Sequence, residues 1–487
     1  MKKTLADSKM IDLGAYQIIP EASRSSHFYI AEVVANYCWQ KHNLFPINTT
    51  TIVEYKDNKF QIYYALKDNH HFLSVLNKFT RKPELLTVLE KYLTETRERA
   101  IKRISSLDVV NLNNKKLSAI LGFYYLQTQE LHKPAMILRL IDRGVLEYFK
   151  NSTGHLKTAD YSSLLSASSR QSFATQENIA LLTLAGKVKN KTINIKSDTY
   201  KRELKKIYNK FYWLTLGYYD EPLATLASYD NRLVALVKQN PLKLLRTLKD
   251  GFIKEQKEKR LVIAKLSKVE KRVAKVAGEV SYLKDYFKFS TNKLQLFGEV
   301  IFKEISRRTG LKIGFIKDLS HADAIALALT GKYNKQIASK YQKHAVFISL
   351  TGKIKIRYDG AIADKYEKKF LSYTKNISGE FKGRIACMGI VSGSAKIVHS
   401  PKDFNKVNKG DILVVMNTGP DFVPILSRVG AIVAEEGGIT AHVSVISREM
   451  KIPCVVGIPR VSREIKNGDL LEVDANKGIV KILKRAK

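Results

Sequence analysis

Apolar residues recur at three- and four-residue spacing through most of the chain between residues 79 and 345. This spacing places the apolar side chains on one face of an α-helix, so it predicts a mostly helical region. No strong internal repeat is evident within it. The predicted helices are Pro83–Ile104, Leu117–Leu131, Pro134–Tyr148, Asp198–Leu216, Tyr229–Val237, Pro241–Phe252 and Leu294–Arg308.

Alternating apolar and polar residues predict strands on either side of this region. Thr51–Tyr55 and Phe60–Tyr64 flank a polar turn and form a predicted hairpin, preceded by an amphipathic helix over Phe28–Trp39. A second predicted hairpin joins Val346–Leu350 to Lys353–Tyr358. Further strands with regular glycine punctuation are predicted at Ser394–His399, Asp411–Met416, Ala431–Ala434, Cys454–Val456, Leu470–Asp474 and Gly478–Leu483.

These patterns divide the chain of 487 residues into three predicted parts. Residues 1–78 form a small mixed α+β segment, and residues 79–375 form a mainly helical domain that we expect to bind a substrate or partner. The polar stretch 365–382 is the predicted hinge to a compact α/β unit at 376–487. The predicted fold class is therefore multidomain, with a mostly helical N-terminal and central region followed by a strand-rich C-terminal domain.

The chain is strongly basic, with 83 Lys and Arg against 46 Asp and Glu, a formal net charge of +37. Such a net charge attracts polyanions. Lysines spread over every solvated face would give the same net charge without a specific binding surface. In residues 253–277, lysine and arginine alternate with leucine, isoleucine and valine, which predicts one long helix with a basic face. We favour a solvated face over one that meets nucleic acid or an acidic partner.

The sequence shows neither an apolar run long enough for a membrane span nor the apolar core of a signal peptide. Its three cysteines, Cys38, Cys387 and Cys454, are too scattered to indicate a disulfide framework or a zinc site. We therefore expect a cytoplasmic protein with no membrane contact and no metal ligands among its site residues.

The segment with the clearest chemistry follows the predicted strand Ala431–Ala434. Gly437–Gly438 permit a sharp turn with close backbone approach. Thr440 is a good N-cap, so Ala441 and His442 fall in the first turn of a helix. The pattern therefore predicts a strand, a glycine turn and a short helix whose first turn contains His442.

His442 is the predicted phosphoryl acceptor. A helix N-terminus offers unpaired N–H groups and favours negative charge, so the turn amides would hold a phosphoryl group there. Imidazole is also a good nucleophile near neutral pH. Arg448 lies six residues further along and would balance the phosphate charge from the far side of the helix. The simpler interpretation, a structural histidine, does not explain why the paired glycines, the cap and the exit at Pro453 occur together.

This run resembles the mobile phosphohistidine domain of phosphoenolpyruvate-utilising enzymes, which include phosphoenolpyruvate synthase, pyruvate phosphate dikinase and rifampicin phosphotransferase. The family's Gly-Gly-x-Thr-x-His pattern appears at residues 437–442, and its Arg-Glu-x-x-Ile-Pro-x-Val-x-Gly pattern at 448–457. Residues 417–424 and 468–478 match its upstream element and closing strands. The resemblance covers about residues 380–487, and it implies a swivelling β/β/α domain in which His442 carries the phosphoryl group.

The resemblance also suggests roles for two neighbouring residues. Thr440 stands where some family members are regulated by phosphorylation, although a simple helix cap is the favoured interpretation. Asp421 would help to position the phosphate loop, with a turn cap as an equal alternative. One element departs from the family: its Ala-Ser-Pro-Gly-x-x-x-Gly opening reads ACMGIVSG at residues 386–393. Both glycines are kept, so we expect a less rigid turn and unchanged chemistry.

Pyruvate-metabolising members of the family carry an ATP-grasp domain before this unit and a phosphoenolpyruvate-binding barrel after it. We expect neither in this chain, because the first 78 residues are too few and the chain ends soon after the matching strands. The helical region is only weakly similar to the domain that precedes the histidine domain in rifampicin phosphotransferase, as in EISRRTGL at residues 304–311.

The expected function is that of a phosphotransferase component. It would carry a phosphoryl group on His442 from a donor to a small-molecule acceptor bound by the helical domain. The donor would be phosphoenolpyruvate or a separate ATP-grasp protein that binds ATP and magnesium, and we expect this chain itself to bind no cofactor. The alternative is a non-catalytic phosphocarrier, or a basic protein that binds nucleic acid or a phosphorylated partner.

Overall fold

The computed structural model of the chain divides into two compact units. The first comprises Met1–Glu147, Leu216–Glu221 and Tyr286–Lys375, and the second comprises Tyr148–Thr215, Pro222–Asp285 and Asn376–Lys487. A boundary between units therefore falls at residue 375, whereas residue 78 lies inside the first unit. The structure describes residues 18–25, 51–56, 59–65, 69–151, 164–216, 223–350, 354–374, 380–398, 401–416, 418, 422–435, 442–458 and 461–486.

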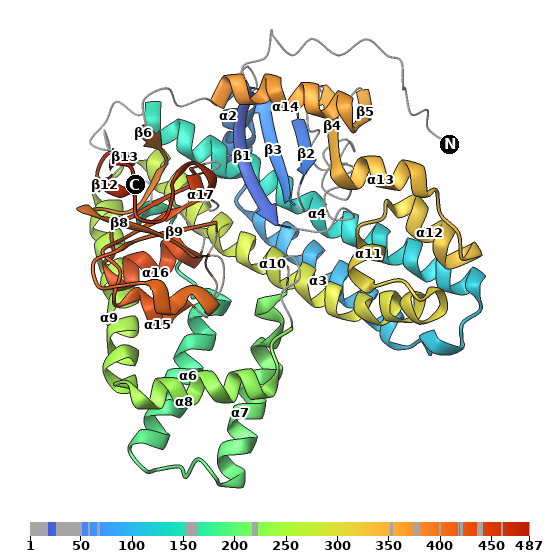
Figure 1. The fold of residues 1–487 in the computed structure, drawn as a ribbon. Coiled ribbons are helices and arrows are strands. Elements are labelled where there is room, and N and C mark those ends of the chain that lie inside the picture. Colours follow the sequence, from blue (N-terminus) through green and yellow to red (C-terminus); the bar gives the residue numbers. More distant parts are fainter. Residues whose placement is uncertain are drawn as a thin grey trace. The chain divides into compact units, whose positions relative to one another are not determined.

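A five-stranded antiparallel sheet in the order β1-β3-β2-β4-β5 belongs to the first unit (Figure 1). Both predicted hairpins are confirmed, and β2 pairs with β4, so the two hairpins form one sheet. Patterns within each hairpin could not predict this pairing, because it joins strands far apart in the sequence. The strands are β1 (Ile18–Ser25), β2 (Thr51–Lys56), β3 (Lys59–Ala65), β4 (His344–Leu350) and β5 (Ile354–Asp359). The predicted helix over Phe28–Trp39 lies outside the described residues.

Helix α4 (Asn114–Asn151) runs without a break through Pro134, where the sequence predicted two separate helices. A proline inside a helix costs about 3 kcal/mol. The side chains of Leu131, Met136 and Ile137 are fully buried on either side of it. Because each buried side chain of this size contributes roughly 1.5–3 kcal/mol, packing outweighs the proline. The other helices of this unit are α2 (Asn69–Arg81), α3 (Glu84–Ser105), α11 (Ile313–Lys317), α12 (His321–Thr330), α13 (Lys335–Lys343) and α14 (Ala361–Thr374).

The single long helix predicted over residues 253–277 is wrong, because α9 ends at Ala264 and α10 begins at Lys268. Ser267 and Glu270 form a reciprocal cap at this break. The Ser267 backbone N–H donates to Glu270 Oε2 at 2.8 Å, and the Glu270 N–H donates to Ser267 Oγ at 3.3 Å. The α-helices between residues 173 and 309 are α6 (Phe173–Lys189), α7 (Asp198–Phe211), α8 (Leu226–Lys238), α9 (Pro241–Ala264) and α10 (Lys268–Thr309).

The C-terminal domain contains an eight-stranded sheet in the order β6-β13-β12-β8-β9-β10-β11-β7. The four strands β8 to β11 run parallel to one another, and the remaining pairs are antiparallel. All six predicted strands are confirmed, and short strands β6 and β7 add to them. The strands are β6 (Glu380–Lys382), β7 (Arg384–Cys387), β8 (Ile390–Val398), β9 (Ile412–Val415), β10 (Ala431–Ala434), β11 (Cys454–Val456), β12 (Leu470–Asp474) and β13 (Ile479–Lys484).

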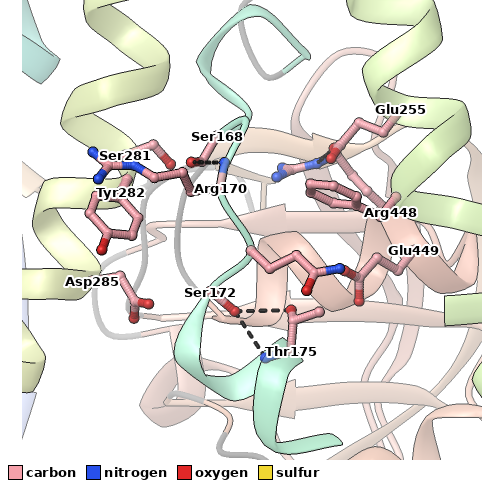
Figure 2. A pocket seen from close by; sticks show the side chains of 12 residues that line it. Ser168, Arg170, Ser172, Thr175, Glu255, Ser281, Tyr282, Asp285, Arg448 and Glu449 are labelled. Atoms are coloured by element: carbon pink, nitrogen blue, oxygen red, sulfur yellow. Dashed lines mark hydrogen bonds and ion pairs between the residues drawn. The ribbon is translucent and has the colours of Figure 1, made fainter. Parts of the chain in front are cut away.

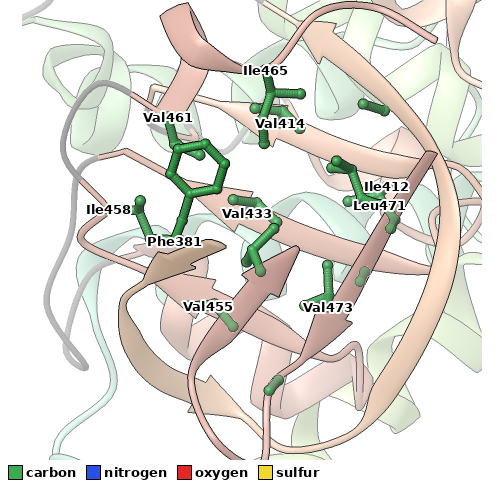
Figure 3. Packing of buried hydrophobic residues seen from close by; sticks show 14 residues of the cluster. Phe381, Ile412, Val414, Val433, Val455, Ile458, Val461, Ile465, Leu471 and Val473 are labelled. Carbon is green, nitrogen blue, oxygen red and sulfur yellow. The ribbon is translucent and has the colours of Figure 1, made fainter. Parts of the chain in front are cut away.

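An aliphatic core fills this domain (Figure 3). Every residue of β9, β10 and β11 is buried, which is typical of parallel strands covered on both faces. The core residues are Phe381, Ala395, Ile412, Val414, Ala431, Val433, Val455, Ile458, Val461, Ile465, Leu471, Val473, Ala475 and Val480. The predicted fold class, a mostly helical region followed by a β-rich C-terminal domain, is therefore confirmed. Among the described helices, none is both long and apolar enough to cross a membrane.

Candidate functional site

Helix α16 (His442–Met450) begins at the predicted phosphoryl acceptor. Val443 and Ile446 bury its apolar face against the domain. The helix ends before Lys451, which adopts a left-handed φ of 55°, and Pro453 follows. The first four N–H groups of an α-helix have no partner within the helix, so this end is suited to an anion.

Two parallel strands bring the motif segments to the same edge of the sheet. Val415 at the end of β9 lies opposite Ala434 at the end of β10. The chain therefore leaves both strands, at Met416 and Glu435, at the carboxyl edge of the sheet, where open α/β sheets bind ligands. The predicted site residues Gly437, Gly438, Thr440, Ala441 and Asp421, and the side chain of His442, lie outside the described residues.

Glu435 at this edge was not predicted as a site residue. Its N–H donates to the Val415 carbonyl at 2.9 Å, and its buried carboxylate accepts a hydrogen bond from Ser462 Oγ. The Ile458 N–H donates to the Ala434 carbonyl at 3.3 Å. These contacts join the carboxyl ends of β9 and β10 to each other and to the segment that follows β11. The available sequence signal was an acidic residue directly after an apolar strand.

Arg448 contacts the helical region. Its Nε donates to Glu255 Oε1 on α9 at 2.6 Å, and both side chains are largely buried (Figure 2). This ion pair lies at the opposite end of α16 from His442. The role predicted for Arg448 in balancing phosphate charge stays a prediction, and the observed contact anchors α16 to α9.

The backbones of α16 and α9 approach closely at Gly251. A Cβ added to Gly251 would lie 3.1 Å from the Glu449 carbonyl oxygen and 3.4 Å from its Cα. A larger side chain would force these helices apart, since protein interiors are closely packed. Together with the Arg448–Glu255 pair, this approach fixes the C-terminal part of α16 against the helical region.

The side chain of Glu449, on α16, is buried. Burial raises the pKa of Glu449 to about 8, and the nearby Glu255 carboxylate adds to the effect, whereas Arg448 and a hydrogen bond with Thr175 oppose it. Among the described residues, no group makes a hydrogen bond with Glu449 Oε2. A carboxyl group with this pKa is mostly protonated at neutral pH, which lowers the cost of burying it.

The pocket beside these residues is lined mainly by residues with polar or charged side chains (Figure 2). Arg170 pairs with Glu279 at 2.6 Å and stacks over the Tyr282 ring, with 3.3 Å between its Cζ and the ring centroid. Arg170 and Arg448 both pair with carboxylates. We therefore interpret the pocket as part of the structural packing rather than as a site that binds an anion. Its lining residues are Ser168, Arg170, Gln171, Ser172, Thr175, Phe252, Glu255, Ser281, Tyr282, Asp285, Arg448 and Glu449.

Two of the scattered cysteines are neighbours in the structure. Cys387 on β7 lies opposite Cys454 on β11, and both are free thiols. Burial raises the pKa of both, that of Cys454 to about 12, so neither is a reactive thiolate at neutral pH. Gly389 follows with a φ of 142°, and a Cβ there would lie 2.5 Å from Pro453 Cγ. The element that departs from the family pattern therefore packs against the exit from α16.

Comparisons with known proteins identify the C-terminal domain. Residues 407–478 match the family model of the PEP-utilising enzyme mobile domain. Over 112 residues the chain is 43% identical to a probable phosphoenolpyruvate synthase from Archaeoglobus fulgidus, and over 99 residues it is 42% identical to a phosphoenolpyruvate synthase from Pyrococcus furiosus. The C-terminal region is therefore a mobile domain of the PEP-utilising type, as the sequence motifs predicted.

These matches are confined to a small part of each protein. They cover 22% and 20% of this chain, and 15% and 12% of the two relatives. Among solved structures, aconitase X from Thermococcus kodakaraensis matches with 21% identity over 22% of this chain and 98% of that chain, at a TM-score of 0.17. A likeness at this TM-score identifies no function.

Proposed function

We propose that the chain is a phosphotransferase component that carries a phosphoryl group on His442 between a donor and an acceptor. The observation that carries this proposal is the position of His442. It is the first residue of α16, the helix that lies between β10 and β11 in the chain, and it falls within the mobile-domain match. The relatives named phosphoenolpyruvate synthase support a phosphotransferase role.

In the proposed first step, an imidazole nitrogen of His442 attacks the phosphorus of the donor. An N–P bond forms as the donor's P–O bond breaks, and the donor oxygen leaves with the electron pair. In the second step, an acceptor hydroxyl attacks the same phosphorus, loses its proton to solvent or a nearby base, and releases the imidazole. Such transfers depend mainly on positioning and charge stabilisation, which the N-terminus of α16 supplies through its N–H groups.

The proposed donor is phosphoenolpyruvate or a separate ATP-grasp protein with ATP and magnesium. The proposed acceptor is a small molecule bound by the helical region. Movement between these partners would require α16 to leave α9. Of the hinge predicted at residues 365–382, residues 365–374 belong to α14 and residues 380–382 to β6 rather than to a linker. The Arg448–Glu255 ion pair and the close approach at Gly251 would then belong to one docked position of the mobile domain.

The test is to incubate the full-length protein with labelled phosphoenolpyruvate and, separately, with labelled ATP, magnesium and a candidate ATP-grasp protein. We expect one donor to give an acid-labile, base-stable adduct in the wild type and in His399→Asn, a control in the same domain. His442→Asn should give none. The absence of an adduct with either donor, or an equal adduct in His442→Asn, would contradict the proposal.

A further inference from the structure

A separate cluster of titratable side chains lies in the first unit, where three elements meet. Glu54 is on β2, His344 begins β4, and Asp364 and Glu367 are on α14. The register places Lys56 opposite His344, and Glu54 lies two residues away on the same face of β2. Asp364 and Glu367 are three residues apart, so they share a face of α14. The fold thus gathers three carboxylates around one imidazole.

The cluster has the geometry of a metal site. His344 Nε2 lies 3.2 Å from Glu54 Oε1, while Nδ1 lies 2.7 Å from Asp364 Oδ1. One potential ligand atom from each of Glu54, His344 and Glu367 lies within 4.8 Å of the other two. His344 and Glu54 are only 2% and 7% exposed, so they are not ordinary surface charges.

We propose that Glu54, His344 and Glu367 bind one divalent transition-metal ion such as Zn²⁺ or Mn²⁺. Nitrogen and oxygen ligands lie about 2.0–2.2 Å from such an ion, so two ligands of one ion stand roughly 3–4 Å apart. The 3.2 Å between His344 Nε2 and Glu54 Oε1 fits this separation.

Asp364 strengthens the assignment, because it occupies the second nitrogen of the imidazole. Histidines that bind metals usually donate their other ring N–H to a carboxylate, which fixes the tautomer and the ring orientation. Here the Asp364 contact with Nδ1 leaves Nε2 directed towards Glu54. Asp364 would therefore be a positioning residue rather than a ligand.

The charges of the cluster also favour a cation. Three carboxylates face one imidazole and the ammonium of Lys56, which binds Glu367. Buried carboxylates are costly unless positive charge offsets them. The Lys56 side chain is 34% exposed, so its ammonium can turn towards solvent when an ion takes its place. A set of one imidazole and two carboxylates suits first-row transition metals better than Ca²⁺ or Mg²⁺.

No local spacing motif in the sequence indicates this site, because Glu54 lies about three hundred residues before His344 and Glu367. Its residues belong to the first unit, whereas His442 belongs to the second. If the cluster binds no ion, it is an ion-pair network that joins α14 to the sheet.

The test uses full-length protein that has been treated with a chelator and dialysed. Zn²⁺ and Mn²⁺ are then titrated by calorimetry, and bound metal is measured by elemental analysis. We expect about one ion per chain and a higher melting temperature with the ion. Glu54→Gln and Glu367→Gln should each lose the ion, and Asp364→Asn should bind it roughly 10- to 100-fold more weakly. His442→Asn should bind as the wild type does.

Circular dichroism checks that each variant is folded. The side chain of Glu367 is more exposed to solvent than that of Glu54. If Glu54→Gln does not fold, the result for Glu367→Gln therefore decides the test. No stoichiometric binding of either metal to the wild type would overturn the proposal. Wild-type affinity retained in the folded Glu367→Gln variant would overturn it equally.

Discussion

The two ends of helix α16 differ in their surroundings and in what they can do. The N-terminal end begins at His442, and the N–H groups of its first turn have no partner within the helix. The C-terminal end is fixed to α9 through Arg448, Glu449 and Gly251. A helix of nine residues therefore separates a reactive end from a docking end, and variants at one end should leave the property of the other intact.

The largest effect is expected from His442→Asn, which should abolish the phosphoryl adduct because asparagine offers no nucleophilic ring nitrogen. Arg448→Ala should keep the adduct, since Arg448 pairs with Glu255 rather than with the N-terminal end of α16. The measurement is adduct stoichiometry per folded chain. If Arg448→Ala lost the adduct as completely as His442→Asn, the two ends would not be separable.

A large effect on stability is expected from pH through Glu449. Its pKa is raised from 4.5 to about 8, so the folded protein holds a proton that the unfolded chain releases. The stability from this group is complete below pH 4.5 and is lost as pH rises through 8.

Glu449→Gln mimics the protonated carboxyl group and should remove this loss. At roughly 1.4 kcal/mol for each unit of pKa shift, we expect a gain of a few kcal/mol over the wild type near pH 9. Denaturant unfolding of both proteins between pH 5 and 9 measures it. Parallel pH profiles for wild type and variant would show that Glu449 is not the titrating group.

The Arg448–Glu255 ion pair should contribute a smaller amount. A double-mutant cycle with Arg448→Ala and Glu255→Ala should give a coupling of about 1–3 kcal/mol, because the pair is short and largely buried. The exposed pair Lys201–Asp198 provides a control, for which about 0.2–0.5 kcal/mol is expected. Equal coupling free energies for the two pairs would show that Arg448 does not anchor α16 to α9.

The smallest effect is expected from two helical glycines. Gly122→Ala in α4 should stabilise the protein by about 0.5–1 kcal/mol, because the nearest atom to its Cβ, Ile325 Cδ1, is 3.7 Å away. Gly251→Ala has the same helical benefit but places its Cβ 3.1 Å from the Glu449 carbonyl oxygen. Its free energy of unfolding should therefore rise less or fall. An equal gain at both positions would mean that α9 and α16 are not tightly packed.

Local patterns in the sequence predicted the C-terminal domain well. Its buried strands are short apolar runs, and the predicted cap at Thr440 placed the start of α16 one residue before the observed start at His442. Residues near one another in the chain therefore carry this information. The contacts of Arg448 and Glu449 could not be predicted in this way, because α9 lies about two hundred residues earlier. The break at Ser267 was readable, since Ser267-x-x-Glu270 is a capping box. We missed this capping box, because the apolar periodicity continues across the break and favoured one long helix.

The position of the phosphoryl group tests the central claim most directly. The phosphorylated wild-type protein should give a ³¹P nuclear magnetic resonance signal of a phosphoramidate, lost on mild acid treatment, and mass spectrometry should place it on the peptide that contains His442. An acid-stable phosphoester on the same peptide, as at Thr440, would contradict the account. So would a phosphoramidate located on any other histidine.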